Sequence, residues 1–255
     1  MSVYAPTVVT KGVSQQLRLS FNIEDIDSLL PCLCLGDFAV FCGSSAVRSL
    51  IDLLCVRTQL PIQLGGLESN VLFVDGGNSF RLYEISSIAQ SMELDPRTVL
   101  ERIFISRTFT AYQMVDLVFE QLEAAVKKYD TKVVVIANLA QQFLDKDVPP
   151  KEAKEIFLQL TKYLQDFTKN NNVILVTTHS PFFWSKQRRF FTEVLCSRAN
   201  IVSSIKKFRN RPYFILEKHP VFKTGKVELS SNETTLTDFS KPKSSMQKVV
   251  TEGSS

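Results

Sequence analysis

Short apolar runs, rich in β-branched residues, alternate along this chain with longer segments of helical period. The runs have no polar alternation, and they lie at 38–42, 71–74, 103–105, 133–136 and 173–177. Strands that are apolar throughout are typical of a parallel sheet whose two faces are both covered. The pattern therefore predicts an α/β fold in which a central, mostly parallel, twisted sheet is flanked by helices.

Two segments between these runs repeat apolar residues at three- and four-residue steps, which predicts one buried face of a helix in each. They are Met114, Leu117, Val118, Leu122, Ala125 and Val126, and then Ile156, Phe157, Leu160, Tyr163, Leu164 and Phe167. Prolines 149 and 150 are expected to open the second helix, and the asparagines at 170–172 to end it. Two later runs, 200–205 and 213–217, predict a closing antiparallel pair.

The 255 residues, 44% of them hydrophobic, are enough for one sizeable core. We expect an N-terminal lead-in over 1–18 and a core domain over 19–229. The segment 230–255 is rich in Ser, Thr and Lys and poor in apolar residues, so it is expected to be a flexible tail.

Charge and cysteine content exclude several classes of protein. The net charge of +4 falls well short of the charge expected of a protein that coats nucleic acid unaided. Neither a membrane span nor a signal peptide is visible, so a cytoplasmic protein without a membrane partner is expected. Five cysteines, an odd number, favour reduced core thiols over disulfides. Cys32 and Cys34 have no second ligand pair at zinc-site spacing and are interpreted as packing residues.

Several short motifs follow one another between residues 22 and 229. They are the segment 23–41, QLP at 59–61, VDGGNSF at 74–80, LDP at 94–96, SRTF at 106–109, the strand 133–136, VTTH at 176–179 and KHP at 218–220. Their order and spacing resemble the ATPase core of RadA-type recombinases, in which the corresponding segments include IDTEGTF, ARAF, the Walker B strand and VTNQ. The resemblance implies a RecA-like, P-loop-type ATPase core with antiparallel strands at its C-terminal end.

The phosphate loop departs from this family. A working loop needs glycines whose backbone N–H groups wrap the phosphates, a Lys for the β and γ groups, and a Ser or Thr for magnesium. Here residues 43–49 read GSSAVRS, with no second glycine, no lysine and about two residues too few. Arg48 and Ser49 could imitate the Lys–Ser pair, although a planar guanidinium fits a phosphate cradle differently from an ammonium. The alternative is an exposed arginine at the start of a helix.

Two catalytic acids are also replaced. The Glu of IDTEGTF, which orients the attacking water in the family, is Gly77 here, and the Walker B Asp that supports magnesium is Ala137. ATP and Mg²⁺ are the cofactors that the resemblance implies, and these losses argue against hydrolysis more strongly than against binding. His179 replaces the Gln that senses the γ-phosphate, although a capping or packing role is favoured. The residues predicted to form a vestigial nucleotide site are Gly43, Ser44, Ser45, Arg48, Ser49, Asp75 and His179.

Two loops bind DNA in RadA-type proteins. The first corresponds to residues 143–150, which carry two acids and suit phosphate poorly. The second, residues 180–191, combines rings that stack on bases with cations that pair with phosphates. The residues predicted to make these contacts are Phe183, Trp184, Lys186, Arg188 and Arg189. Such residues suit docking to a protein equally well, and packing within the protein is a third alternative. Further cations at 206, 207, 209 and 211 are expected in a solvated turn between strands.

These observations favour a binding protein without catalysis. The leading hypothesis is a catalytically degenerate RecA-fold paralogue that acts as an accessory protein in DNA recombination or repair. Its expected partner is a recombinase or another RecA-fold protein, with single-stranded DNA as a further ligand. One alternative is a weak ATPase or ATP-binding regulator whose site is completed by a partner subunit. The other is a KaiC-like signalling scaffold.

Overall fold

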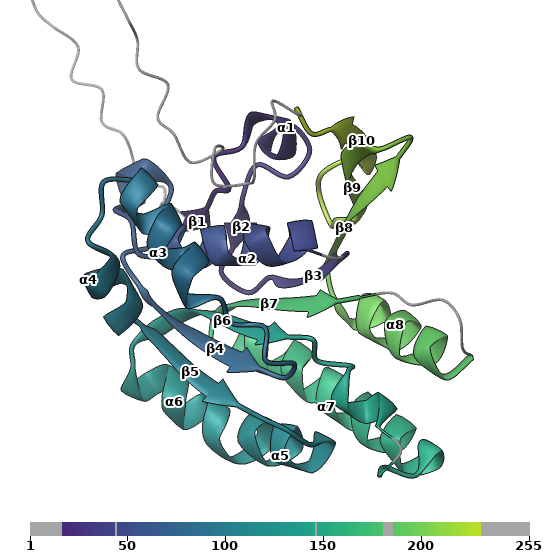
Figure 1. Ribbon diagram of the computed structural model, residues 1–255. Helices are drawn as coiled ribbons and strands as arrows, with labels where there is room; N and C mark the ends of the chain where they lie inside the picture. Colours follow the sequence, from purple (N-terminus) through teal and green to yellow (C-terminus); the bar gives the residue numbers. More distant parts are fainter. Residues whose placement is uncertain (1–16, 44, 146, 181–185, 231–255) are drawn as a thin grey trace, which may run out of the picture.

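A single eight-stranded sheet organises the molecule (Figure 1). The computed structural model describes residues 17–43, 45–145, 147–180 and 186–230, except that the side chains of 186–188 are not described. The strand order is β10-β9-β8-β3-β7-β6-β4-β5. The strands are β3 (Phe38–Cys42), β4 (Asn70–Asp75), β5 (Ile103–Arg107), β6 (Thr131–Ala137), β7 (Ile174–His179), β8 (Ile201–Phe208), β9 (Arg211–Lys218) and β10 (Gly225–Glu228).

The parallel part of the sheet confirms the sequence pattern. Strands β5, β4, β6, β7, β3 and β8 pair side by side in parallel. The predicted closing pair is β8 and β9, which are antiparallel, and β10 adds a third strand that the pattern did not indicate. A separate two-stranded sheet, β1 (Arg18–Leu19) with β2 (Leu33–Cys34), was also not predicted. Strands of two residues are too short to show a period.

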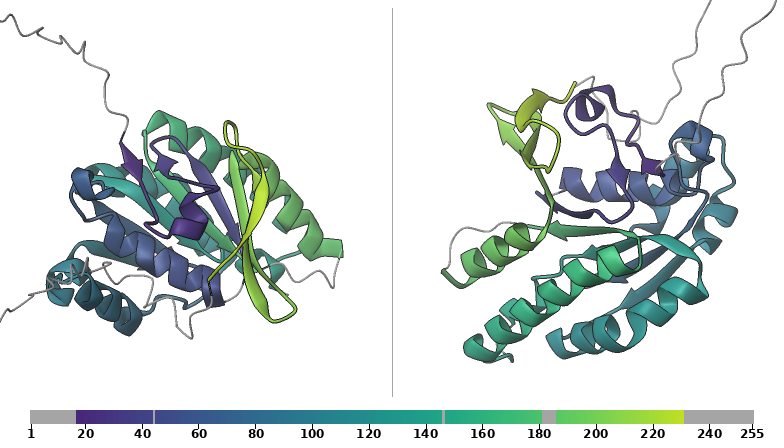
Figure 2. Two further views of the ribbon diagram at one scale, coloured as in Figure 1. Left: turned by 90° about the horizontal axis from the view of Figure 1, so that it is seen from above. Right: turned by 180° about the vertical axis from the view of Figure 1, so that it is seen from behind.

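Each face of the sheet is covered by its own layer of helices (Figure 2). Neighbouring side chains of a strand enter different cores, as Phe41 and Val40 of β3 do. One layer holds α2 (Ser45–Arg57), α3 (Leu82–Ser91) and α4 (Pro96–Glu101). The other holds α5 (Ala111–Asp116), the π-helical turn η2 (Leu117–Gln121), α6 (Leu122–Lys128), α7 (Pro150–Asn170) and α8 (Lys186–Arg198).

The two predicted helices are present. The first is interrupted by η2, whose π-helical geometry lies between α5 and α6. The second is α7, which has a proline in its first turn and ends at Asn170. Asn172 then adopts a φ of 51°, a left-handed conformation that asparagine tolerates better than most residues.

The two segments that correspond to the DNA-binding loops of RadA-type proteins are more structured than expected. The first begins in a 3₁₀ turn, η3 (Gln142–Leu144), in which Phe143 is fully buried. The second is helical from Lys186 onward, so the expectation of a loop over all of 180–191 is wrong for its second half. The reason is packing: the ring of Phe191 is buried, and its centroid lies 4.8 Å from that of Phe157 on α7.

Shorter elements complete the fold on the side of α2. They are α1 (Glu24–Asp27) and the 3₁₀ turn η1 (Ile62–Leu64).

All five cysteines are free thiols, and the sulfur atoms of Cys32 and Cys34 lie 4.0 Å apart. Among the described residues, no helix has both the length and the apolar character required to cross a membrane.

Candidate nucleotide site

The C-terminal ends of the parallel strands meet at one edge of the sheet, where open α/β proteins bind their ligands. Most residues predicted to form a nucleotide site lie there, because Gly43 follows β3, Asp75 ends β4 and His179 ends β7. Cys42 pairs with His179 in the register between β3 and β7, so these two strand ends are direct neighbours. Ser44 lies outside the described residues.

The connection from β3 to α2 is short. Only residues 43 and 44 separate the two elements. The backbone N–H of Gly43 donates to the carbonyl oxygen of His179 at 3.0 Å, so it is already used within the protein. A Cβ at residue 43 would lie 2.7 Å from Val47 Cγ2 and 3.0 Å from the Ile205 carbonyl oxygen. Gly43 is therefore required by close packing, whether or not a phosphate binds.

The first turns of α2 contain a polar cluster that the motif comparison did not predict. Arg81, just before α3, places its Nη2 atom 2.5 Å from Asp52 Oδ2 and 2.8 Å from Ser49 Oγ. Its Nε atom also donates to Asp52 Oδ2 at 2.9 Å. The Ser49 hydroxyl, predicted to stand in for the magnesium-binding Ser, is thus bound by a guanidinium. Arg48 and Ser45 are exposed on the same helix.

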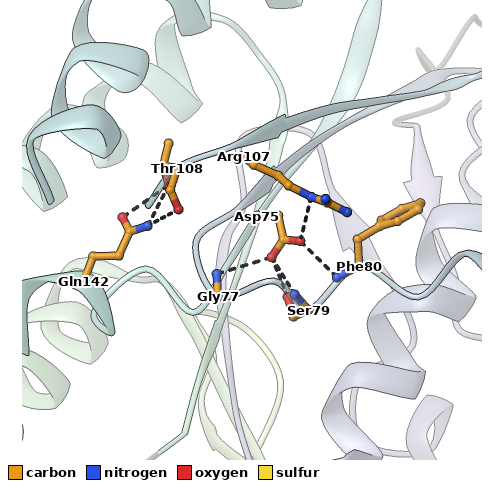
Figure 3. Close-up of polar contacts among 7 residues, drawn as sticks. All are labelled: Asp75, Gly77, Ser79, Phe80, Arg107, Thr108 and Gln142. Carbon is orange, nitrogen blue, oxygen red and sulfur yellow. Dashed lines mark hydrogen bonds and ion pairs between the residues drawn. The ribbon is translucent and has the colours of Figure 1, made fainter. Parts of the chain in front are cut away.

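Asp75 forms the centre of a second cluster (Figure 3). Its Oδ1 atom accepts from the backbone N–H of Ser79 at 2.7 Å, from the Ser79 hydroxyl at 3.0 Å and from the N–H of Gly77 at 3.3 Å. Its Oδ2 atom accepts from the N–H of Phe80 at 3.1 Å and lies 3.8 Å from Arg107 Nε. The carboxylate has no exposed surface. The Asp75 carboxylate therefore stabilises the turn after β4 by accepting hydrogen bonds from the residues of that turn.

Gly77 and the residues at the end of β6 lie against each other, at the positions that the resemblance aligns with two acids. A Cβ at Gly77 would lie 2.7 Å from Asn138 Nδ2, so the side chain of Asn138 occupies the space beside it. Asn138 follows the buried Ala137, has a φ of 56°, and donates its N–H to Thr178 Oγ1 at 2.9 Å. The N–H of Gly76 donates to the Ala137 carbonyl oxygen at 3.1 Å. Backbone and amide contacts therefore hold the ends of β4 and β6 together.

The buried side-chain amide of Gln142 joins the ends of β5 and β6, the two strands on either side of β4. The Nε2 atom of Gln142 donates to the carbonyl oxygen of Thr108 and, at 3.0 Å, to its hydroxyl. The Thr108 hydroxyl can in turn donate to Gln142 Oε1 at 3.2 Å (Figure 3). Thr108 follows β5, and Gln142 begins η3 after β6. This pair therefore fixes the start of the segment that corresponds to the first DNA-binding loop.

His179 makes a contact within the protein. Its side chain is buried, and its Nε2 atom lies 2.6 Å from the hydroxyl of Thr192 on α8. This geometry supports the packing alternative for His179. Of the residues predicted to contact DNA or a partner, Arg189 is exposed and pairs with Glu193 one helical turn away, Nε to Oε1 2.7 Å. Phe183, Trp184 and the side chains of Lys186 and Arg188 lie outside the described residues.

Arg81 and Asp52 are the members of this site that motif comparison missed. Asp52 lies between Ile51 and Leu53 in an otherwise apolar run of α2, and a carboxyl in such a run needs a buried partner. That signal pointed to a cation without indicating which one. Among the described residues, no group of three or more His, Cys, Asp or Glu side chains could hold a metal ion. The site thus offers guanidinium and hydroxyl groups, but its one strand-end carboxylate is already fully bonded.

Replacing Asp75 tests the closed turn. We expect Asp75→Asn to lower the free energy of unfolding by about 2–4 kcal/mol, because hydrogen bonds to a charged group contribute roughly 1.5–3 kcal/mol each. The amide also directs N–H groups at a backbone donor. Urea unfolding measures the change, and Asp147→Asn, at an exposed acid, is the matched control. Equal stability of the two variants would contradict a structural role for Asp75.

The pH dependence of stability tests the buried Asp52. Burial raises the pKa of its carboxyl from 3.8 to about 6, although Arg81 acts in the opposite direction. Between pH 4 and 6 the folded state therefore binds more protons at Asp52 than the unfolded state does, and the Asp52 contribution to stability falls as the pH rises. As the pH rises from 4 to 6, urea unfolding should show the Asp52→Asn variant becoming more stable relative to the natural protein, because the amide does not ionise. The opposite slope would mean that the ion pair with Arg81 outweighs burial.

Comparison with known proteins supports one family. A sequence model of the Rad51 family matches residues 35–180, which is more than half of the chain. The meiotic recombination protein DMC1 of Saccharomyces cerevisiae is 29% identical over 147 residues. That stretch covers 55% of this chain and 43% of the yeast protein. The matched region runs from just before β3 to the end of β7 and includes every strand end described above. On this evidence, the chain belongs to the Rad51 family.

Proposed function

We propose that this protein is an accessory member of the Rad51 family that acts in DNA recombination or repair without hydrolysing ATP. One observation carries the proposal: the polar groups at the strand ends are bonded to each other. Asp75 is saturated by its own turn, Gly77 lies against Asn138, and Ser49 accepts from Arg81. A yeast relative named for meiotic recombination supports the pathway.

The chemistry of hydrolysis supports the same proposal. Transfer of a γ-phosphoryl group depends on a positioned water and on a metal that neutralises the developing charge. Ala137 and Gly77 have no atoms that could serve either purpose. Adding a carboxylate at residue 77 alone would not repair the site, because Asn138 occupies the adjoining space. Selection on such a protein would act on what it binds.

The terminal strand β5 is the surface best suited to a protein partner. It ends the order of strands in the described sheet, so one side of its backbone can accept another strand. Large apolar residues are exposed along this strand and just after it, namely Ile105, Phe109 and Tyr112. Phe109 is 74% exposed. We propose that an extended segment of a recombinase, or of another RecA-fold protein, pairs with β5.

An apolar hollow beside β5 adds a side-chain pocket to this surface. Its volume is about 50 Å³, enough for one apolar side chain. The hollow lies between the strands β4 and β5 and the helical segment that contains η2. The lining residues include Leu72, Val74, Phe104, Leu117 and Leu122. Backbone pairing along the edge and one anchored side chain together would provide both affinity and specificity.

ATP turnover tests the proposed lack of hydrolysis. The purified protein should release phosphate at the background rate, with or without single-stranded DNA, and Arg48→Ala should leave that rate unchanged. Turnover that Arg48→Ala abolishes would overturn the proposal and favour the nucleotide-regulator alternative. Because Arg48 is exposed at the start of α2, calorimetry with ATP should accompany the assay. Calorimetry reports binding without hydrolysis.

Charge at the β5 edge tests the partner surface. The double variant Ile105→Asp, Phe109→Asp should bind an active Rad51-family recombinase from the same organism at least about tenfold more weakly, because it places charge in an apolar contact. The control is Tyr83→Asp, which places the same charge at an aromatic residue that is 87% exposed on the helix α3 and not on the edge strand. Affinity is measured by surface plasmon resonance. Equal affinity of both variants would exclude β5 as the docking strand.

A further inference from the structure

The far edge of the sheet carries an exposed face of aromatic and cationic side chains. Pairing places Lys206 opposite Tyr213, and Phe208 opposite Arg211, in the hairpin of β8 and β9. Tyr213 is in turn opposite Glu228 of β10. Since side chains alternate along a strand, these residues share one face of the three strands, together with Lys226. The other face is buried and includes Phe214 and Leu216.

This face is hollowed. A groove of about 650 Å³ is lined by Phe208, Arg209, Arg211, Tyr213 and Lys226. The rings of Phe208 and Tyr213 meet edge to face, with centroids 5.6 Å apart, and the ammonium of Lys226 lies 5.9 Å from the centre of the Tyr213 ring. Phe208 is 50% exposed although it is a large apolar residue. An aromatic surface left open among cations is the composition of a base-stacking platform.

Positive charge is concentrated in this part of the chain. Residues 206–228 contain seven Lys and Arg residues against two Glu residues, whereas the whole chain has 30 Lys and Arg against 26 Asp and Glu. The two glutamates hold neighbouring groups in place: Glu228 accepts from Arg211 and from the Tyr213 hydroxyl, and Glu217 accepts from Lys206. In the described part of the chain, Lys207 and Arg209 have no carboxylate within 4.0 Å.

The tip of the hairpin has a defined shape. Arg209 and Asn210 form the two-residue connection, and both have positive φ, 48° and 64°. Two consecutive residues of positive φ are typical of the tight turn that follows the twist of a hairpin. The cation of Arg209 is thus presented by an ordered turn between two paired strands. The sequence pattern had indicated only a solvated turn here.

We propose that the groove on β8, β9 and β10 binds single-stranded DNA. Phe208 and Tyr213 would stack on bases, and Arg209 and Lys226, which line the groove, would contact phosphates. This inference deepens the proposed function, on which it rests, by naming the surface that meets DNA. The groove lies at the opposite edge of the sheet from β5 (Figure 1). The protein could therefore hold a partner and a DNA strand at the same time.

Binding of labelled oligothymidylate to the full-length protein tests the groove. A length of about 20 nucleotides exceeds the roughly 4–16 that a single domain contacts. By fluorescence anisotropy, Phe208→Ala should weaken binding about tenfold at every salt concentration, and Phe208→Trp should restore it, because the loss is one of stacking. The double variant Arg209→Ala, Lys226→Ala should instead flatten the dependence of log affinity on log salt, by about 0.7 for each lost phosphate contact.

The control is Arg97→Ala, Lys127→Ala, which removes two exposed cations from α4 and α6. It should retain the natural affinity and salt dependence, and thermal unfolding should show all variants folded. Equal weakening by this control would reduce the effect to net charge and overturn the proposal. Equal affinity for single-stranded and duplex DNA would also overturn the proposal. A third contradicting outcome would be that replacing Lys186, Arg188 and Arg189 abolishes binding of oligothymidylate while the variants of the groove bind it normally.

A natural protein that binds no oligothymidylate at all would overturn the groove and leave the proposed function standing. That function is tested separately by ATP turnover and by recombinase binding at β5. Conversely, ATP turnover that depends on Arg48 together with hairpin-dependent DNA binding would overturn the proposed function and retain the groove.

Discussion

Burial of the parallel sheet on both faces is the constraint on which the rest of the structure depends. Each central strand sends alternate side chains into two separate cores, so the strands must be apolar throughout and both helical layers must be present. Polar side chains buried inside the strands are small and neutral, such as Thr177 and Ser203, and the charged side chains of the sheet lie near the strand ends and along its two edges. Each proposed activity of this protein lies at one of those places.

The strand ends show how the protein itself stabilises the polar groups at this edge of the sheet. Carboxylates that a nucleotide and metal would otherwise neutralise are costly when they are buried and unpaired. Here Asp75 is bonded within its own turn and Asp52 is paired with Arg81. The site is therefore satisfied by the protein alone. A fold whose buried polar groups are paired within the protein can be stable without a ligand.

The two edges of the sheet differ in chemistry. At β5 the exposed side chains are mainly apolar, and a hollow for one apolar group lies beside them. At β8, β9 and β10 the side chains are cationic and aromatic, and the groove is wider. The first edge suits a protein segment and the second a single strand of DNA. Because the sheet separates them, binding at one edge leaves the other accessible.

The amino-acid sequence was sufficient to predict the fold class, the central strands and the two amphipathic helices, because periodicity records which side chains face the core. The loss of two catalytic acids at Gly77 and Ala137 is what the resemblance implies, and it stays a prediction. Only the tertiary structure decided which groups meet: the pairing of Arg81 with Asp52, the contact of His179 with Thr192, and the burial of Phe191. These contacts join residues that are distant in the chain, and the residues around one partner do not indicate which distant residue it will contact. The groove was hidden for the same reason, because its rings and cations come together only when β9 pairs with both β8 and β10.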